Sequence, residues 1–157
     1  MSLDTYLRLG ETITLGSHTF TPEAIKAFAA KYDPQRFHMD EEEAKSSVFG
    51  SLCASGWHTA ATWMKYNLAA REDAGEMPWT GEGEAPEFGP SPGFQNLKWL
   101  KPVYAGETIT FTRRAVSHRA LTSRPGWRIV TLICEAFDSR NDKVIEFESV
   151  VLVKAGR

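Results

Sequence analysis

The chain has 157 residues, of which 42% are hydrophobic and 24% are charged, and this composition predicts a single domain over residues 1–157. The formal net charge is −2 and the basic residues are scattered, so the basic stripe typical of nucleic-acid binding is lacking. No apolar run approaches the ~20 residues of a membrane span and the N-terminus does not resemble a secretory signal, so we expect a cytoplasmic protein with no membrane partner.

The first part of the chain predicts a strand and a helix. Residues 11–20 alternate threonine with apolar residues, which indicates a strand. Thr21 can cap a helix whose first position is Pro22, and helical spacing of apolar residues continues to about Tyr32. Pro34 disfavours helical geometry at the residue before it, so we expect the chain to leave the helix at YDPQRFHMD and to form a short acidic helix at DEEEAKSS.

A long central helix is predicted within SLCASGWHTAATWMKYNLAA. Its apolar residues recur at helical spacing, and the opposite face is not strongly polar. These residues are Trp57, Ala60, Ala61, Met64 and Leu68. We therefore expect this helix to be largely buried against a sheet.

The second part predicts a long excursion and then a sheet. Residues 71–94 are rich in proline and glycine, with four of the eight prolines and five of the twelve glycines, and loops of this length often serve as lids or interface segments. Four strand-like segments follow, FQNLKWLKPV, GETITFTRRAVSH, GWRIVTLICEAFD and KVIEFESVVLVK, with hairpin turns expected at 124–126 and 138–142. An α+β fold satisfies this order, with a five-stranded antiparallel sheet, its last four strands in a meander, wrapped around the central helix.

Several features are better explained by structure than by chemistry. Cys53 and Cys134 lie far apart among apolar neighbours, which favours buried thiols over a zinc site or a redox pair. The run HMDEEE fits an acidic helix start better than a metal site, and Gly81-Glu82-Gly83 lacks the flanking elements of a dinucleotide loop. His58, at the start of the central helix, fits a structural or pocket-lining role. We expect no metal and no cofactor.

Three motifs resemble the MaoC-like dehydratases, the family that contains the (R)-specific enoyl-CoA hydratases. The family's motif D-x-N-P-x-H-x-D is matched by Asp33 and His38, five residues apart, with Asp40 behind them. The glycine that opens the family's central helix, eighteen residues after the histidine, is matched by Gly56. PVYAGE resembles the family's P-V-x-x-G-[DE] turn. The resemblance covers nearly the whole chain and implies the hotdog fold, a sheet wrapped around a long helix.

The resemblance implies an acyl-CoA hydratase or dehydratase that acts on a 2-enoyl thioester of coenzyme A or of an acyl carrier. Asp33 and His38 would share one water and move its protons, and the Gly56 N–H would stabilise the enolate oxygen at the helix N-terminus. Pro34 would stiffen the loop that presents this pair. Ser55, Trp57 and Gln35 are the expected substrate-binding neighbours.

Two departures from the family pattern leave other functions open. Gln35 stands where the motif has asparagine, in a P-Q-R-F version of the loop, and Met64 stands where well-studied hydratases have a serine. A non-catalytic hotdog subunit that binds acyl thioesters or a partner chain is therefore an alternative. A hotdog thioesterase is a third reading, which the spacing of Asp33 and His38 disfavours.

Partners follow from the expected sheet, because a five-stranded sheet around one helix leaves an edge strand bare. Hotdog relatives pair their sheets side by side, so we expect a homodimer or an assembly of dimers in which residues 71–94 help to complete the partner's site. Surface cations would hold the nucleotide end of coenzyme A, with Lys98, Lys101 and Arg128 as candidates.

Overall fold

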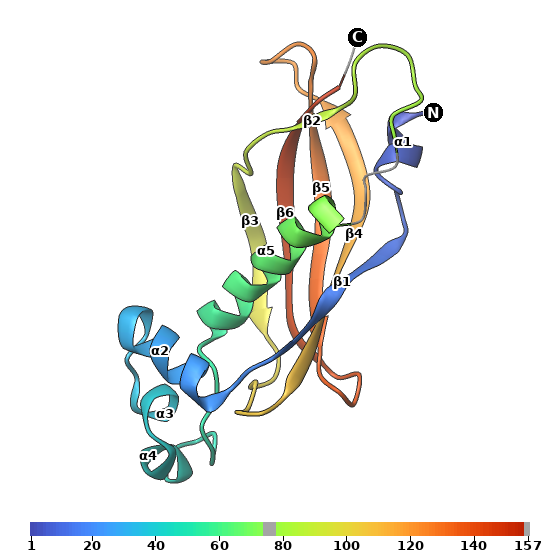
Figure 1. Cartoon of the computed structure of the whole chain (residues 1–157). Coiled ribbons are helices and arrows are strands. Elements are labelled where there is room, and N and C mark those ends of the chain that lie inside the picture. Colours follow the sequence, from blue (N-terminus) through green and yellow to red (C-terminus); the bar gives the residue numbers. More distant parts are fainter. Residues whose placement is uncertain (74–77, 156–157) are drawn as a thin grey trace.

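The structure is a computed structural model that describes residues 1–73 and 78–155. The elements in chain order are α1 (Leu3–Tyr6), β1 (Thr12–Thr19), α2 (Pro22–Tyr32), α3 (Arg36–Met39), α4 (Glu41–Lys45), α5 (Gly56–Asp73), β2 (Glu87–Phe88), β3 (Gly93–Trp99), β4 (Thr108–Ala120), β5 (Trp127–Phe137) and β6 (Lys143–Lys154). α5 lies across one face of a curled antiparallel sheet, as Figure 1 shows. α2, α3 and α4 gather at the N-terminal end of α5, and the N-terminus and the end of β6 lie at the opposite end of the molecule.

The sheet has six strands in the order β1-β4-β5-β6-β2, and β3 also pairs with β6. The predicted antiparallel sheet around a helix is confirmed, but the four-strand meander is wrong, because only β4, β5 and β6 follow one another. β3 lies at the far edge from β4, since the chain between them runs beside the segment before α5. There the Ala54 N–H donates to the Val103 oxygen at 2.8 Å, and the Ala105 N–H donates to the Leu52 oxygen at 3.0 Å.

Local sequence signals account for most of the helix boundaries. The Thr21 side chain accepts the Ala24 N–H, and Pro22 opens α2 as predicted. Asp40 caps α4 by accepting the Glu43 N–H at 2.9 Å. The sequence did not predict α3, which is a single turn inside the P-Q-R-F loop. It also placed Arg71–Asp73 in the excursion, whereas these residues form the last turn of α5.

The central helix is not oriented as its apolar pattern suggested. Trp57, Met64 and Leu68 are 51%, 42% and 49% exposed. The side that faces the sheet instead consists of His58, Thr59, Thr62, Trp63 and Asn67, which are all buried. The expectation of a largely buried helix is therefore wrong for the apolar stripe, because the side with the polar residues faces the sheet and several of its groups are bonded there. The Trp63 indole N–H, for example, donates to the Thr112 oxygen at 2.9 Å.

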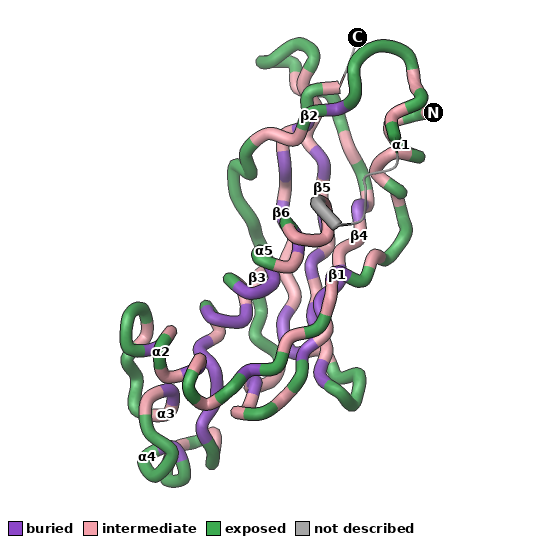
Figure 2. Tube along the Cα trace, in the orientation of Figure 1, coloured by how far each residue is buried: buried purple, intermediate pink, exposed green. Residues whose placement is uncertain are grey.

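The core lies between the sheet-facing side of α5 and strands β4, β5 and β6, and buried positions alternate most regularly along β5 (Figure 2). Its largest fully buried side chains include Trp63, Phe20 and Phe111. β3, in contrast, is exposed along most of its length. Cys53 and Cys134 are buried free thiols, as predicted, and burial raises their pKa to about 11 and about 12. Among the described residues, no helix is long and apolar enough to cross a membrane.

Candidate active site

A pocket of about 450 Å³ opens beside the N-terminus of α5. It brings together five of the six predicted site residues, which are Asp33, Gln35, His38, Gly56 and Trp57. The sixth, Ser55, does not line the pocket but contacts Asp33 directly. Met64 and His58 lie outside its lining, with Met64 on the exposed side of α5.

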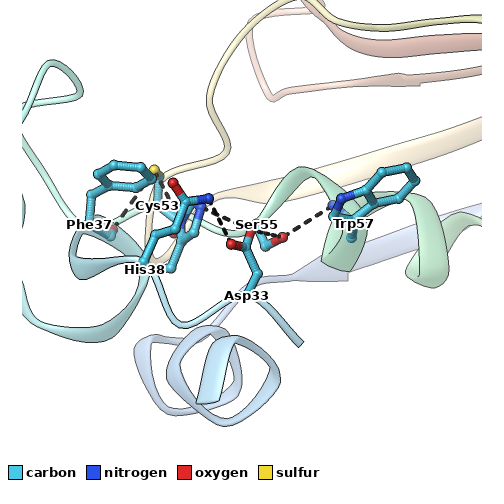
Figure 3. A network of polar contacts seen from close by, with 7 residues as sticks. Asp33, Phe37, His38, Cys53, Ser55 and Trp57 are labelled. Atoms are coloured by element: carbon cyan, nitrogen blue, oxygen red, sulfur yellow. Dashed lines mark hydrogen bonds and ion pairs between the residues drawn. The ribbon is translucent and has the colours of Figure 1, made fainter. Parts of the chain in front are cut away.

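Asp33 and His38 are brought together by the break between α2 and α3. α2 ends at Tyr32, so Asp33 is the residue after its last turn, and His38 lies on the one-turn helix α3. The His38 Nε2 lies 3.5 Å from the Asp33 Oδ2, with the histidine side chain 7% exposed and the aspartate side chain 16% exposed. Figure 3 shows the two side chains side by side, with Ser55 next to the carboxylate.

The orientation of His38 is fixed by the main chain. Its Nδ1 lies 2.6 Å from the carbonyl oxygen of Cys53. Because a carbonyl oxygen can only accept, Nδ1 carries the hydrogen and donates it. In the neutral ring, Nε2 is then an acceptor, and it is this atom that faces Asp33. The Cys53 thiol lies on the same side, with Sγ 3.7 Å from Nδ1.

Both oxygens of Asp33 hold hydrogen bonds. The Ser55 hydroxyl donates to Oδ2 at 2.6 Å, and the Gln35 amide donates to Oδ1 at 2.7 Å. Partial burial raises the pKa of Asp33, but the hydrogen bonds from Ser55 and Gln35, together with His38, outweigh it and hold the pKa below its ordinary value. The carboxylate is therefore ionised at neutral pH.

Gly56 is the first residue of α5, and an indole lies against it. A methyl group added at Gly56 would come within 2.4 Å of the Trp99 ring. Trp57 meets the same indole edge to face, with ring centroids 4.9 Å apart. In the described part of the chain, the hydrogen bonds at this helix start use the Trp57 N–H, which donates to the Ser55 hydroxyl at 3.3 Å, and do not include the Gly56 N–H. That amide is available to a ligand.

Sequence reasoning missed the wall of the pocket opposite Asp33. This wall comprises Trp99, Leu100, Pro102, Val103 and Val144, with Phe37 and Phe49 beside His38. The signal was the strand end WLKPV, which we used as a family motif but did not place against the helix start. The wall makes most of the pocket apolar, as is usual for sites that bind small molecules.

The candidate cations for a coenzyme A nucleotide occupy different settings. Lys101 lines the pocket, but its Nζ already contacts Asp138 at 2.6 Å and Asp142 at 3.0 Å. Arg128 donates to the His118 Nδ1 at 2.7 Å. Lys98 lies on β3 opposite Glu146. Among the described residues, no three His, Cys, Asp or Glu side chains are grouped as a metal site would require.

Comparisons with known proteins identify the family of this chain and one relative of similar length. A family model described as a MaoC like domain matches residues 7–126. The uncharacterized protein YdeM of Bacillus subtilis strain 168 is 26% identical over 155 residues, which cover 98% of this chain and 99% of that protein.

Two solved structures are also similar. The crystal structure of a MaoC-like dehydratase from Rhodospirillum rubrum superposes with a TM-score of 0.77 at 31% identity, covering 100% of this chain and 98% of the other. An (R)-hydratase from A. caviae involved in PHA biosynthesis gives a TM-score of 0.66 at 22% identity, covering 91% of this chain and 94% of that chain, a likeness that concerns the fold.

Proposed function

Because the chain belongs to the MaoC-like domain family and has its hotdog fold, we propose that it adds water to, or removes it from, a 2-enoyl thioester. The observation that carries this proposal is the Asp33–His38 pair, with 3.5 Å between Nε2 and Oδ2, at the mouth of an apolar pocket beside a helix N-terminus. The name of the similar A. caviae protein, an (R)-hydratase, supports an (R)-3-hydroxyacyl product.

The pair suits a single bound water. The Asp33 carboxylate and the His38 Nε2 are both acceptors, so a water between them can donate one hydrogen to each. The water oxygen then bonds to C3 of the enoyl group while one proton passes to Asp33. The electron pair of the double bond moves into the thioester, and the proton is returned to C2 through the Asp33–His38 pair. The hydroxyl group at C3 and the hydrogen at C2 therefore arrive on the same face of the double bond.

The enolate oxygen formed between these steps needs a hydrogen-bond donor. The Gly56 N–H lies at the N-terminus of α5, where the helix dipole is positive and the amide is not used by the fold. Preorganised donors of this kind contribute ~3–4 kcal/mol in comparable sites. Trp57 and Trp99 then form the aromatic surface next to the thioester.

Exposed apolar side chains on α5 and β3 support the proposal of a dimer. Trp57, Met64 and Leu68 of α5 and Phe94 and Trp99 of β3 are all exposed, and the Trp57–Trp99 contact joins the two sets into one apolar patch. β3 is also an edge strand that pairs only on its β6 side among the described residues. A patch of this kind beside a bare strand edge is unusual for a monomer. A second copy of the chain is the proposed occupant.

One observation favours the alternative of a non-catalytic subunit that binds acyl thioesters. The P-Q-R-F loop places the Gln35 amide on the Asp33 Oδ1, so the carboxylate carries a hydrogen bond on each oxygen and is a weaker base. The pocket would still bind an acyl group, because its apolar wall does not depend on that loop.

One experiment separates these functions. The protein is incubated with 2-butenoyl-CoA while the absorbance of the conjugated thioester and the release of free thiol are followed together. Loss of absorbance without thiol is expected. Thiol release would show a thioesterase, and tight binding without either change would show a binding subunit.

A further inference from the structure

Two buried threonines on α5 differ in how their hydroxyls are used. Thr62 is 7% exposed, and its hydroxyl donates to the His58 oxygen one turn back at 2.8 Å. This back-bond is the usual fate of a threonine hydroxyl within a helix. Thr59 is only 2% exposed, yet among the described residues its hydroxyl has no hydrogen-bond partner. The corresponding acceptor, the Ser55 oxygen, already receives the His58 and Thr59 N–H groups at 2.9 and 3.2 Å.

The free hydroxyl of Thr59 belongs to the pocket. Thr59 lines it together with Asp33, His38 and Gly56. It lies four residues after Ser55, whose hydroxyl is bonded to Asp33, so the two residues share one side of the helix start. Helical side chains lean toward the N-terminus, which directs Thr59 toward the end of the helix where Asp33 and His38 lie. Among the described residues, the fully enclosed side-chain atoms without a hydrogen-bond partner are the His58 Nδ1 and the Trp79 Nε1, so the unpaired Thr59 oxygen is open to a molecule in the pocket.

The proposed reaction needs a hydrogen-bond donor to the oxygen of the reacting water, and the Thr59 hydroxyl can supply it. A water held between the Asp33 carboxylate and the His38 Nε2 donates both hydrogens, and its oxygen can still rotate about the line that joins the two acceptors. One donor into an oxygen lone pair would stop this rotation and leave the other lone pair for C3. The Ser55 hydroxyl is already committed to Asp33, and Lys101 to two aspartates. Thr59 has the one hydroxyl among the described residues that line this pocket.

We propose that the Thr59 hydroxyl donates a hydrogen bond to the oxygen of the reacting water and so completes a three-point water site with Asp33 and His38. This inference rests on the proposed hydratase function and deepens it. Thr59 acts on the water and not on the acyl group, which sets it apart from the apolar wall of the pocket.

The test compares Thr59→Val, which keeps the shape but removes the hydroxyl, with Thr59→Ser, which keeps the hydroxyl. Thr62→Val is the matched control, because its hydroxyl is bonded within the helix. Hydration of 2-butenoyl-CoA gives kcat and KM, calorimetry gives the Kd for saturated butanoyl-CoA, and thermal melts monitor folding. We expect Thr59→Val to lower kcat about tenfold, the worth of one neutral hydrogen bond, and to leave the Kd for butanoyl-CoA unchanged. Thr59→Ser and Thr62→Val should keep kcat within about threefold.

Four outcomes overturn the inference. A normal kcat in folded Thr59→Val removes it, as does a similar loss in Thr62→Val. A weaker Kd for butanoyl-CoA in Thr59→Val would assign the hydroxyl to the acyl group. If Asp33→Asn abolishes hydration while Thr59→Val does not alter it, the proposed function stands and only this inference fails. A parent protein with no hydratase activity defeats both.

Discussion

The two sides of α5 use their residues in opposite ways. The side that faces the sheet is rich in polar groups, with His58, Thr59 and Thr62 all buried. The side that faces outward carries Trp57, Met64 and Leu68, each more than 40% exposed. A helix that served only to fill a core would show the reverse arrangement. The difference supports both proposals made above, a site built on the inner side and a second copy of the chain on the outer side.

The largest effect is expected where the inner side meets Asp33. Asp33→Asn keeps the shape but removes the charge that accepts the proton of water, and His38→Ala removes the imidazole, so each should lower turnover about 10²–10⁴-fold. Because both act on one water, the double variant should be little worse than the poorer single one. Initial rates on 2-butenoyl-CoA with parallel melts provide the measurement. Asp40→Asn is the control, since Asp40 caps α4 and lies outside the pocket lining. Near-normal rates in folded Asp33→Asn would refute the mechanism.

The next effect concerns His58, whose Nδ1 is buried without a partner and whose ring stacks on Phe28, with centroids 4.6 Å apart. Burial, with a smaller contribution from His18, lowers the pKa of His58 from 6.5 to about 4. The unfolded chain therefore binds more protons between these values, so stability should fall as pH decreases from 6.5 to about 4 and be fully present above 6.5. The loss should reach up to about 3 kcal/mol.

Urea unfolding at a series of pH values measures this loss. His58→Phe keeps a stacked ring without a titrating group and should flatten the profile in that window. An equally steep profile in His58→Phe would assign the acid sensitivity to other groups.

The outer side predicts an effect on association alone. Met64→Glu and Leu68→Glu place a carboxylate in the apolar patch, and burying an unpaired charge there should weaken dimerisation at least about 100-fold. Melting of the monomer should change little, because both side chains are about half exposed in the single chain. Light scattering across a concentration series measures the effect, with Lys65→Glu, at an exposed position of the same helix, as control. A parent protein that is monomeric at micromolar concentration would contradict the proposed interface.

The smallest effect tests the contact between the helix start and Trp99. Gly56→Ala would place a methyl group 2.4 Å from the indole, and such overpacking typically costs ~1–3 kcal/mol. Trp99→Ala removes the obstacle, so the double variant should be as stable as Trp99→Ala alone. Thermal unfolding of the four proteins closes this cycle. A full penalty for Gly56→Ala in the absence of Trp99 would mean that another contact requires the glycine.

The site was predictable to the extent that it follows local rules. Pro34 ends α2 and so places Asp33 at a helix terminus, and the spacing to His38 and Gly56 matched a known motif. The orientation of α5 was not predictable, because the periodicity of Trp57, Met64 and Leu68 shows that they share a side but not what covers it. In the single chain the sheet covers the other side of the helix, and helical periodicity alone does not distinguish the two sides.

Contacts between distant segments were also beyond local reasoning. The position of β3 at the edge of the sheet depends on the course of the chain around Val103. The Val103 oxygen accepts a hydrogen bond from the Ala54 N–H, which is distant in the sequence. The same long-range pairing places Trp99 over Gly56, and the spacing of neither residue indicates it.

His38 is held by a main-chain group and Asp33 by side chains, so the two differ in their sensitivity to substitution of their partners. His38 is oriented by the carbonyl oxygen of Cys53, which every amino acid at position 53 would supply. Asp33 depends on the side chains of Ser55 and Gln35, and a single substitution at either position removes one of them. Substitution of residue 53 therefore leaves the acceptor for the His38 Nδ1–H in place. Substitution of residue 35 or 55, in contrast, changes the basicity of the Asp33 carboxylate. If related sequences differ in whether they hydrate the thioester or only bind it, we expect the substitutions that separate them at positions 35 and 55.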